Sequence, residues 1–309
     1  MSDIWIIAEN TLWARTLAAA AAALGKGGKI TAFVHGDEAA AKDAIAHGAS
    51  EAFYLPLPAD APWEAYTPAL VDKAKAEKPA LILLSTSRRC RDVAARMAAL
   101  LDAPCFSDGK NIALADGGVT ANTLLYGGLA VKTSVAKGAT VLVTIGAKDF
   151  DHGAPDASRS GKIDTLPLSA AGVSVTGRKP REAQSVDLGA AAKVVSVGRG
   201  VSKESDLDTV RALAKSMGAE VACSRPIAEF FKWMPEECYI GISGQQIKPQ
   251  LYLAIGISGQ AQHYFGIRDS KTIVSINKDK ECLMNQQADY YIPADWEETV
   301  AELAKAIHK

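Results

Sequence analysis

Short apolar runs alternate with helical patterns along the first half of the chain. The run PALILLSTS at 79–87 is apolar almost throughout, as expected for a strand buried on both faces of a parallel sheet. Similar runs at 4–9 and 29–36 are each followed by a helical pattern that ends at glycine. From 117 to 146 the pattern becomes strand, turn, strand. Strands that alternate with helices predict a doubly wound α/β domain with a parallel sheet.

The alternation restarts after a polar stretch. Residues 150–187 have few apolar positions and much glycine, proline, serine and charge, which is typical of a connection between domains and leaves room for one edge strand. We therefore expect two α/β domains, 1–185 and 190–309, joined through a polar connection at about 150–190. The second domain is predicted to have strands at 193–200, 220–226, 251–259, 271–279 and 288–295, a short helix at 260–267 and an amphipathic helix from 296.

Composition narrows the class of protein. The length of 309 residues also favours two domains, and 48% hydrophobic with 22% charged residues is ordinary for a soluble globular protein. A net charge of -1 gives no electrostatic reason to expect a nucleic-acid partner. No apolar run approaches the roughly 20 residues of a spanning helix, and the opening MSDIWIIAEN lacks the basic region of a signal peptide. We expect a cytoplasmic protein without membrane insertion.

The cysteines do not suggest a metal site or a disulfide framework. They are odd in number, widely spaced and without a C-x-x-C pair, and the five histidines do not cluster with them. We expect free thiols and no bound metal. The five are Cys90, Cys105, Cys223, Cys238 and Cys282.

Three strand ends in the second half carry glycine, serine or arginine: Gly198-Arg199-Gly200, Ser224-Arg225-Pro226 and Gly256-Ile257-Ser258-Gly259. In an open α/β sheet, ligands bind beyond the carboxyl ends of the strands, where glycines let backbone N–H groups approach a phosphate. An arginine there adds a bidentate phosphate partner. The pattern favours a pyrophosphate site, although it is neither G-x-G-x-x-G nor a P-loop, and such glycines also serve as plain turn residues.

A histidine follows the last of these strand ends. His263 lies five positions after Ser258, on the first turns of the predicted short helix. One interpretation is a capping or half-buried structural histidine. The other is a donor that stabilises negative charge on a ligand ring, such as the N1–C2=O edge of a reduced isoalloxazine. Arg225 likewise has a structural and a functional interpretation. It forms an ion pair within the protein, or it places a positive charge beside the ligand ring.

These residues belong to longer segments that resemble a known family. LYLAIGISGQAQHYFGIRDSKTIVSINKDKE at 251–281, VVSVGRG at 194–200 and CSRPIAEFFKWMPEECYIGISG at 223–244 closely resemble the FAD domain of electron transfer flavoprotein alpha subunits. IWIIAE, the 79–101 segment and YGGLA extend the likeness over nearly the whole chain. The SRPIAE and GISGQ variants are most similar to the bacterial FixB-type branch. The resemblance implies an adenine-nucleotide-hydrolase-like first domain and a Rossmann-like, FAD-binding second domain.

The resemblance also implies roles for individual residues. Arg199 matches an arginine that contacts the FAD pyrophosphate, and Ser224 and Arg225 match a pair beside the flavin ring. In the stretch 240–243, Ser243 stands for a threonine that reaches the ring, while Ile242 replaces a glutamine and removes a polar contact. The stretch 258–263 matches the segment that holds the phosphates and places His263 at the flavin O2. Asn277 and Asp289 match contacts at the adenosine end. The full candidate set is Arg199, Ser224, Arg225, Ile240, Gly241, Ile242, Ser243, Ser258, Gly259, Gln260, Ala261, Gln262, His263, Asn277 and Asp289.

The leading hypothesis is therefore the alpha subunit of a heterodimeric electron transfer flavoprotein. It implies FAD, a homologous beta subunit packed on the first domain, and electron transfer through an anionic semiquinone to an acyl-CoA dehydrogenase- or reductase-type partner, without catalysis by the chain itself. Whether the beta subunit holds FAD or AMP separates bifurcation from simple transfer. One alternative is an enzyme or sensor that binds adenine nucleotide through the first domain and no flavin. Another is an assembly scaffold that has lost its cofactor.

Overall fold

The computed structural model describes residues 3–25, 27–58, 60–115, 118–146, 150, 153–168, 173–177, 188–189 and 191–307. Contacts divide the chain into two compact units, Met1–Leu125 with Leu129–Pro180, and Arg181–Lys309 with Tyr126–Gly128. The predicted domain limits at 185 and 190 lie outside the described residues and stay predictions.

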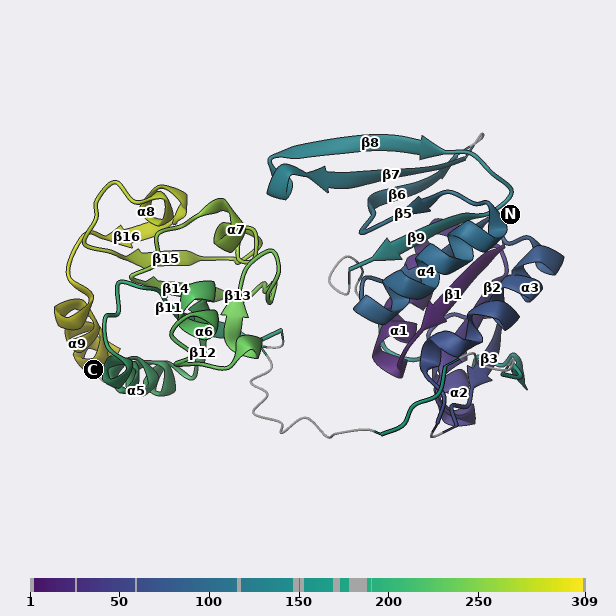
Figure 1. Cartoon of the computed structure of the whole chain (residues 1–309), viewed down its shortest axis with the longest axis horizontal. Helices are drawn as coiled ribbons and strands as arrows, with labels where there is room; N and C mark the ends of the chain where they lie inside the picture. The colour runs from purple at the N-terminus through teal and green to yellow at the C-terminus, as the bar shows by residue number, and fades with distance from the viewer. Residues whose placement is uncertain are drawn as a thin grey trace. The chain divides into compact units, whose positions relative to one another are not determined.

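The first unit is built on a seven-stranded parallel sheet (Figure 1). Its strand order is β10-β3-β2-β1-β4-β9-β5, and each pair of neighbours is parallel. The polar segment contributes the edge strand β10. The strands are β1 (Ile4–Ala8), β2 (Ile30–His35), β3 (Glu51–Leu55), β4 (Leu81–Ser85), β5 (Cys105–Phe106), β9 (Val141–Ile145) and β10 (Lys162–Thr165).

Two apolar cores flank this sheet. On one face, α1 (Thr11–Gly25) and α2 (Glu38–Ala46) pack with an antiparallel sheet of β6 (Lys110–Ala115), β7 (Gly118–Leu125) and β8 (Ala130–Ala136). The turn η2 (Tyr126–Gly128) joins β7 to β8. On the other face lie η1 (Trp63–Tyr66), α3 (Thr67–Glu77) and α4 (Arg88–Leu101). Buried apolar side chains on both faces explain the uninterrupted apolar run at β4.

The second unit carries a six-stranded sheet that is also parallel throughout. Its order is β13-β12-β11-β14-β15-β16. Two α/β units with parallel sheets confirm the predicted fold class. The strands are β11 (Lys193–Val197), β12 (Glu220–Ser224), β13 (Tyr239–Ile240), β14 (Leu251–Ile255), β15 (Ile273–Ile276) and β16 (Tyr290–Ile292).

Helices cover both faces of the second sheet (Figure 1). The elements η3 (Glu204–Asp206), α5 (Leu207–Met217) and α9 (Trp296–Ile307) lie on one face, together with α6 (Arg225–Glu229) and η4 (Glu236–Cys238). The short α7 (Ala261–Tyr264) and α8 (Leu283–Gln287) belong to the other. The strand predicted at 220–226 ends at Ser224, because Pro226 lacks a strand donor and suits the first turn of α6.

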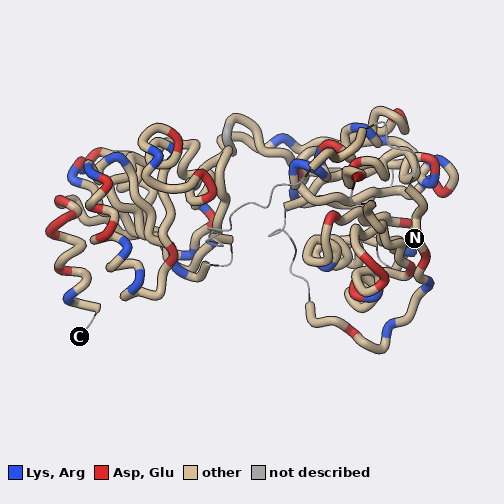
Figure 2. Tube along the Cα trace, turned by 60° about the horizontal axis from the view of Figure 1, so that its bottom comes forward, with Lys and Arg blue, Asp and Glu red and all other residues tan. Residues whose placement is uncertain are grey.

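Charged residues of both signs are spread over the chain. Basic and acidic residues are interspersed along the described parts of both units (Figure 2). Among the described residues, no helix combines the length and apolar character needed to cross a bilayer.

Candidate functional site

The chain order of the second sheet reverses between its two central strands. From β11 the chain moves outward through β12 and β13, then returns to β14 and continues through β15 and β16 on the other side. The switch point lies between the carboxyl ends of β11 and β14, where doubly wound sheets bind ligands. A cavity of about 440 Å³ opens at this edge, lined by the ends of β11, β12, β14 and β15 and by the loop after β13.

Glycines make the floor of the cavity. The Gly200 N–H donates to the Gly256 carbonyl at 3.0 Å, so the two loops touch through backbone. A Cβ on Gly198 would lie 2.3 Å from the Gly256 oxygen, and one on Gly200 would lie 2.6 Å from the Gly256 Cα. Side chains are therefore excluded here, and the two strand ends meet through backbone alone. Arg199, between these glycines, is exposed on the cavity wall and has no ion-pair partner within the described part of the chain.

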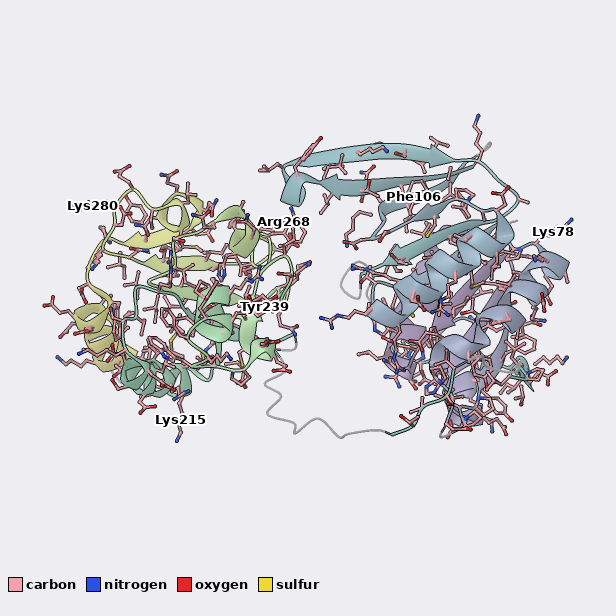
Figure 3. The ribbon with its side chains drawn as sticks, viewed as in Figure 1. Lys78, Phe106, Lys215, Tyr239, Arg268 and Lys280 are labelled. Atoms are coloured by element: carbon pink, nitrogen blue, oxygen red, sulfur yellow. The ribbon has the colours of Figure 1, made fainter. Side chains whose placement is uncertain are left out.

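The first GISG tetrad lies against the helix that follows the second. The Ile242 N–H, in the first tetrad, donates to the Gln262 carbonyl at 2.8 Å, just beyond the second. Ser243 Oγ accepts from the Tyr239 hydroxyl at 3.1 Å, and Tyr239 is labelled in Figure 3. Ile242 is 44% exposed and lines the cavity together with Gly241 and Gln262. The repeat in the sequence thus forms one continuous wall.

The second tetrad is divided between the cavity and the core. Ser258 and Gln260 line the cavity, and the Ser258 carbonyl accepts from the Met284 N–H at 3.2 Å. Gly259 does not line it: its φ is +77° and a Cβ there would lie 2.1 Å from Met284 N, so it allows the close approach of α8. Ala261 begins α7, is exposed and does not line the cavity.

His263 is buried at the cavity wall with one nitrogen engaged. It is 7% exposed, and its Nε2 lies 2.7 Å from the Tyr252 hydroxyl. Its Nδ1 is buried and makes no hydrogen bond within the described residues. Burial lowers the pKa of His263 to about 4, against a smaller opposite effect of the Ile240 carbonyl. The imidazole is therefore neutral near pH 7.

A cation stands at the end of β12. Ser224 is 9% exposed and Arg225 follows it as the first residue of α6; both line the cavity. Arg225 Nε donates to Glu229 at 2.7 Å, and this hydrogen bond and ion pair raise the pKa of the guanidinium. The predicted cation is present, and it is paired with a carboxylate of its own helix.

Asn277 lines the cavity but its side chain holds the loops together. Its Nδ2 donates to the Ile257 carbonyl at 2.9 Å, and its Oδ1 accepts from the Asp279 N–H at 3.1 Å. Asn277 thus ties the end of β15 to the second GISG tetrad.

Asp289 lies away from the other candidates. Its carboxylate accepts from the Ile273 N–H at 2.8 Å, at the first residue of β15, so it sits at the amino edge of the parallel sheet, opposite the cavity. The carboxylate that follows the carboxyl end of β16 is that of Asp295, which accepts from the Glu297 N–H at the start of α9. Two acidic residues flank this strand, and the sequence pattern alone does not tell which edge each occupies.

Beyond the candidate set and the three strand-end motifs, four further residues belong to the site. Tyr239, Asp279 and Cys282 line the cavity, and Tyr252 supports His263 from the sheet. Asp279 follows β15 within two residues of Asn277, which is the signal that the sequence offered. Tyr252 lies inside an apolar run, so it reads as a core residue.

The structure holds a second cavity, of about 560 Å³, in the first unit. It is lined by residues of η1, α3 and α4 with Val173, and no glycine is among the lining residues that the structure describes. The backbone cradle expected for a nucleotide phosphate is present only at the first cavity, among these two. The described residues also contain no cluster of histidine, cysteine and acidic side chains able to bind a metal ion.

A parallel sheet with a glycine cradle and a buried histidine at its switch point defines an α/β protein of the dinucleotide-binding class. The chain matches the family model of the electron transfer flavoprotein domain over residues 4–171, and that of the electron transfer flavoprotein FAD-binding domain over residues 187–268. It belongs to the electron transfer flavoprotein family, in the alpha-subunit and FixB branch.

Relatives of this branch match along the whole chain. Protein FixB of Escherichia coli O157:H7 is 38% identical over 310 residues, which cover 99% of this chain and 98% of that protein. Protein FixB of Salmonella typhimurium is 37% identical over 298 residues, covering 95% of this chain and 94% of that protein.

The FAD-binding domain indicates FAD as the cofactor, and the cavity fits it. Gly198, Gly200 and Gly256, where a Cβ would overlap the backbone of the facing loop, hold the two strand ends together at the cavity, and Arg199 between them offers a guanidinium to a diphosphate. His263 lines the same cavity, and its buried Nδ1 makes no hydrogen bond within the described residues, as expected where a ligand supplies the partner. When bound, FAD supplies the redox chemistry; the chain supplies binding and charge.

Proposed function

We propose that this chain is the FAD-binding alpha subunit of a heterodimeric electron transfer flavoprotein. It carries electrons one at a time between a donor and an acyl-CoA dehydrogenase- or reductase-type partner, and a beta subunit packs against its first unit. The full-length match to the FixB proteins supports this function.

The observation that carries the proposal is the buried, unpartnered Nδ1 of His263 in the cavity wall. A donor at this place stabilises negative charge on the bound isoalloxazine. Arg225 adds a positive charge on the same cavity, and Arg199 with the glycine cradle serves the diphosphate. Asn277 acts through the loop that it holds. In this assignment the site binds the cofactor and adjusts its charge, and no group is placed for catalysis on a substrate.

Co-purification of the chain with its beta subunit, followed by stepwise reduction, tests the proposal. We expect a yellow complex. During reduction it should show the red absorption of the anionic flavin semiquinone. A colourless complex that FAD cannot restore would refute the FAD assignment. A flavin that takes up two electrons without this step would refute one-electron transfer.

A further inference from the structure

The first GISG tetrad is built around the side chain of Tyr239. This residue lies in β13, is 8% exposed and lines the cavity. Its carbonyl accepts from the Gln245 N–H at 2.9 Å, so the loop returns to the strand that it leaves. A Cβ on Gly244 would lie 2.3 Å from Tyr239 Cε2, and the missing side chain therefore lets the tyrosine ring lie directly on the loop backbone.

Hydrogen bonds hold the backbone on both sides of Ser243. The Gly244 N–H donates to the Gly241 carbonyl at 3.1 Å, and the Ile242 N–H donates to the Gln262 carbonyl at 2.8 Å. The residues before and after Ser243 are thereby fixed. What remains to be fixed is the rotation of the Ser243 side chain about χ1.

The Tyr239 hydroxyl supplies this last constraint. It lies 3.1 Å from Ser243 Oγ, in hydrogen-bonding distance. Ser243 itself is exposed on the cavity wall, where a ligand can reach it. A serine hydroxyl has one proton and two lone pairs, so Ser243 can bond a ligand while it keeps its bond with the tyrosine.

A serine at this place depends on such a partner more than a threonine would. The second branch on the Cβ of threonine restricts χ1, whereas serine lacks this branch and can occupy three staggered positions. A hydrogen bond from a buried tyrosine that packs on the loop selects one of these positions before a ligand arrives. Less side-chain freedom is then lost on binding.

We propose that Tyr239 is a positioning residue whose hydroxyl holds the Ser243 side chain in the position that offers Oγ to a ligand in the cavity. This inference rests on the proposed function, in which that ligand is FAD. It assigns to Tyr239 an effect on FAD binding that passes through Ser243.

Tyr239→Phe tests the hydroxyl alone, because phenylalanine keeps the ring that packs on Gly244. The full chain, co-purified with its beta subunit and freed of FAD, is titrated with FAD. The Kd should rise about threefold, since a released serine spends roughly one third of its time in the competent position. The matched control is Tyr290→Phe, which removes an exposed hydroxyl of β16 outside the cavity and should leave the Kd unchanged. A wild-type Kd in Tyr239→Phe would overturn the proposal.

Substitutions of Ser243 show whether the effect passes through this residue. Ser243→Ala removes the hydroxyl that Tyr239 holds, so the further change Tyr239→Phe should raise the Kd no more. In Ser243→Thr the branched side chain restricts χ1, so Tyr239→Phe should raise the Kd by less than it does beside serine. An equal rise beside serine, alanine and threonine would show that Tyr239 acts independently of Ser243, which contradicts the proposal.

Two further measurements separate positioning from stability. The flavin reduction potential of Tyr239→Phe should shift in the same direction as that of Ser243→Ala, which a loss of folding stability alone would not cause. NMR of the wild-type, FAD-free full chain labelled at serine should show a single χ1 position for Ser243. Averaging over several positions would overturn the proposal, and this measurement needs no variant that folds.

The outcomes distinguish the two proposals. If wild type and Tyr239→Phe bind FAD with the same Kd, the role of Tyr239 is overturned while the proposed function stands. A wild-type complex that binds no FAD refutes the proposed function, and this inference with it.

Discussion

Arg225 and Glu229 form a pair whose effect on a bound flavin has two opposing parts. Arg225 brings a positive charge to the cavity, and Glu229, 29% exposed at its side chain, sits 2.7 Å from it. The guanidinium is exposed to water on its other side, so salt screens its field. The carboxylate both orients the arginine and offsets its charge.

Substitutions of Arg225 and of Glu229 should shift the flavin reduction potential in opposite directions. Arg225→Gln removes the positive charge and is expected to lower the potential, because the reduced cofactor is the more negative form. Glu229→Gln removes the offset and is expected to raise it. Both shifts should shrink as salt is added. A redox titration of each variant at low and high salt checks this; an unchanged potential in Arg225→Gln would refute its assigned role.

His263 should also make stability depend on pH. The folded pKa is about 4, whereas an unfolded imidazole titrates near 6.5. Between these values the unfolded state binds more protons, so the free energy of unfolding rises from about pH 4 to 6.5 and is level above, by up to roughly 3 kcal/mol. The free energy of unfolding of the FAD-free chain can be measured by urea denaturation at several pH values in this range. In His263→Gln it should no longer rise by this amount between about pH 4 and 6.5. An equal slope in both proteins would contradict the buried neutral histidine.

At this scale, the sequence indicated residue types better than contacts. Arg199 was predicted because it stands at a strand end between glycines, His263 because it follows such a strand end, and Ser243 from the resemblance to the family. Tyr252 was not, since a tyrosine in an apolar strand gives no sign of the group that it faces. Asp289 was placed with the ligand, but the hydrogen bond with Ile273 puts it at the opposite edge of the sheet.

Among the elements, the loops after β11 and β14 depend on the absence of side chains. Gly256 has a φ of +62°, and a Cβ on it would lie 2.7 Å from the Gly200 Cα. Gly218, after α5, has the same φ of +62° but open space around it. A side chain at Gly218 would meet only backbone strain, whereas a side chain at Gly256 would also overlap the facing loop.

Gly256→Ala and Gly218→Ala should therefore differ. Gly218→Ala is expected to cost about 1 kcal/mol of unfolding free energy, the usual cost of a left-handed alanine. Gly256→Ala adds a backbone overlap, about 1–3 kcal/mol more, and should also reduce FAD content after purification. Urea midpoints and flavin absorbance test both variants. Equal losses in the two, with full FAD content, would show that close packing of the loops is not needed.

Element types were predictable, and element ends less so. Periodicity placed β4, β11 and β14 because their apolar runs face two cores. The predicted strand at 288–295 shrank to Tyr290–Ile292, which pairs only with β15. The short β13 and α6 were not predicted, since a few residues carry no measurable period. The longer β6 was not predicted either.

At the scale of the whole molecule, each unit has its own parallel sheet and its own pair of cores. The polar composition of 150–187 was enough to predict two domains.

Separate cores should give separate responses to ligands. FAD at 100 times its Kd is expected to stabilise the second unit by about 2.7 kcal/mol, and to raise only one of two thermal transitions of the isolated chain. Calorimetry with and without FAD checks this. A rise of the other transition with ATP or NAD, and none with FAD, would favour the adenine-nucleotide alternative.

The edge strand β10 has a consequence for synthesis at the ribosome. It joins the first sheet beside β3, a strand made more than 100 residues earlier in the chain. Until residues 162–165 emerge, the open hydrogen-bonding edge of β3 can pair with another nascent chain. The first unit thus completes its sheet only when its last described strand has been made, and a ribosome stalled before that point would release a product prone to aggregate.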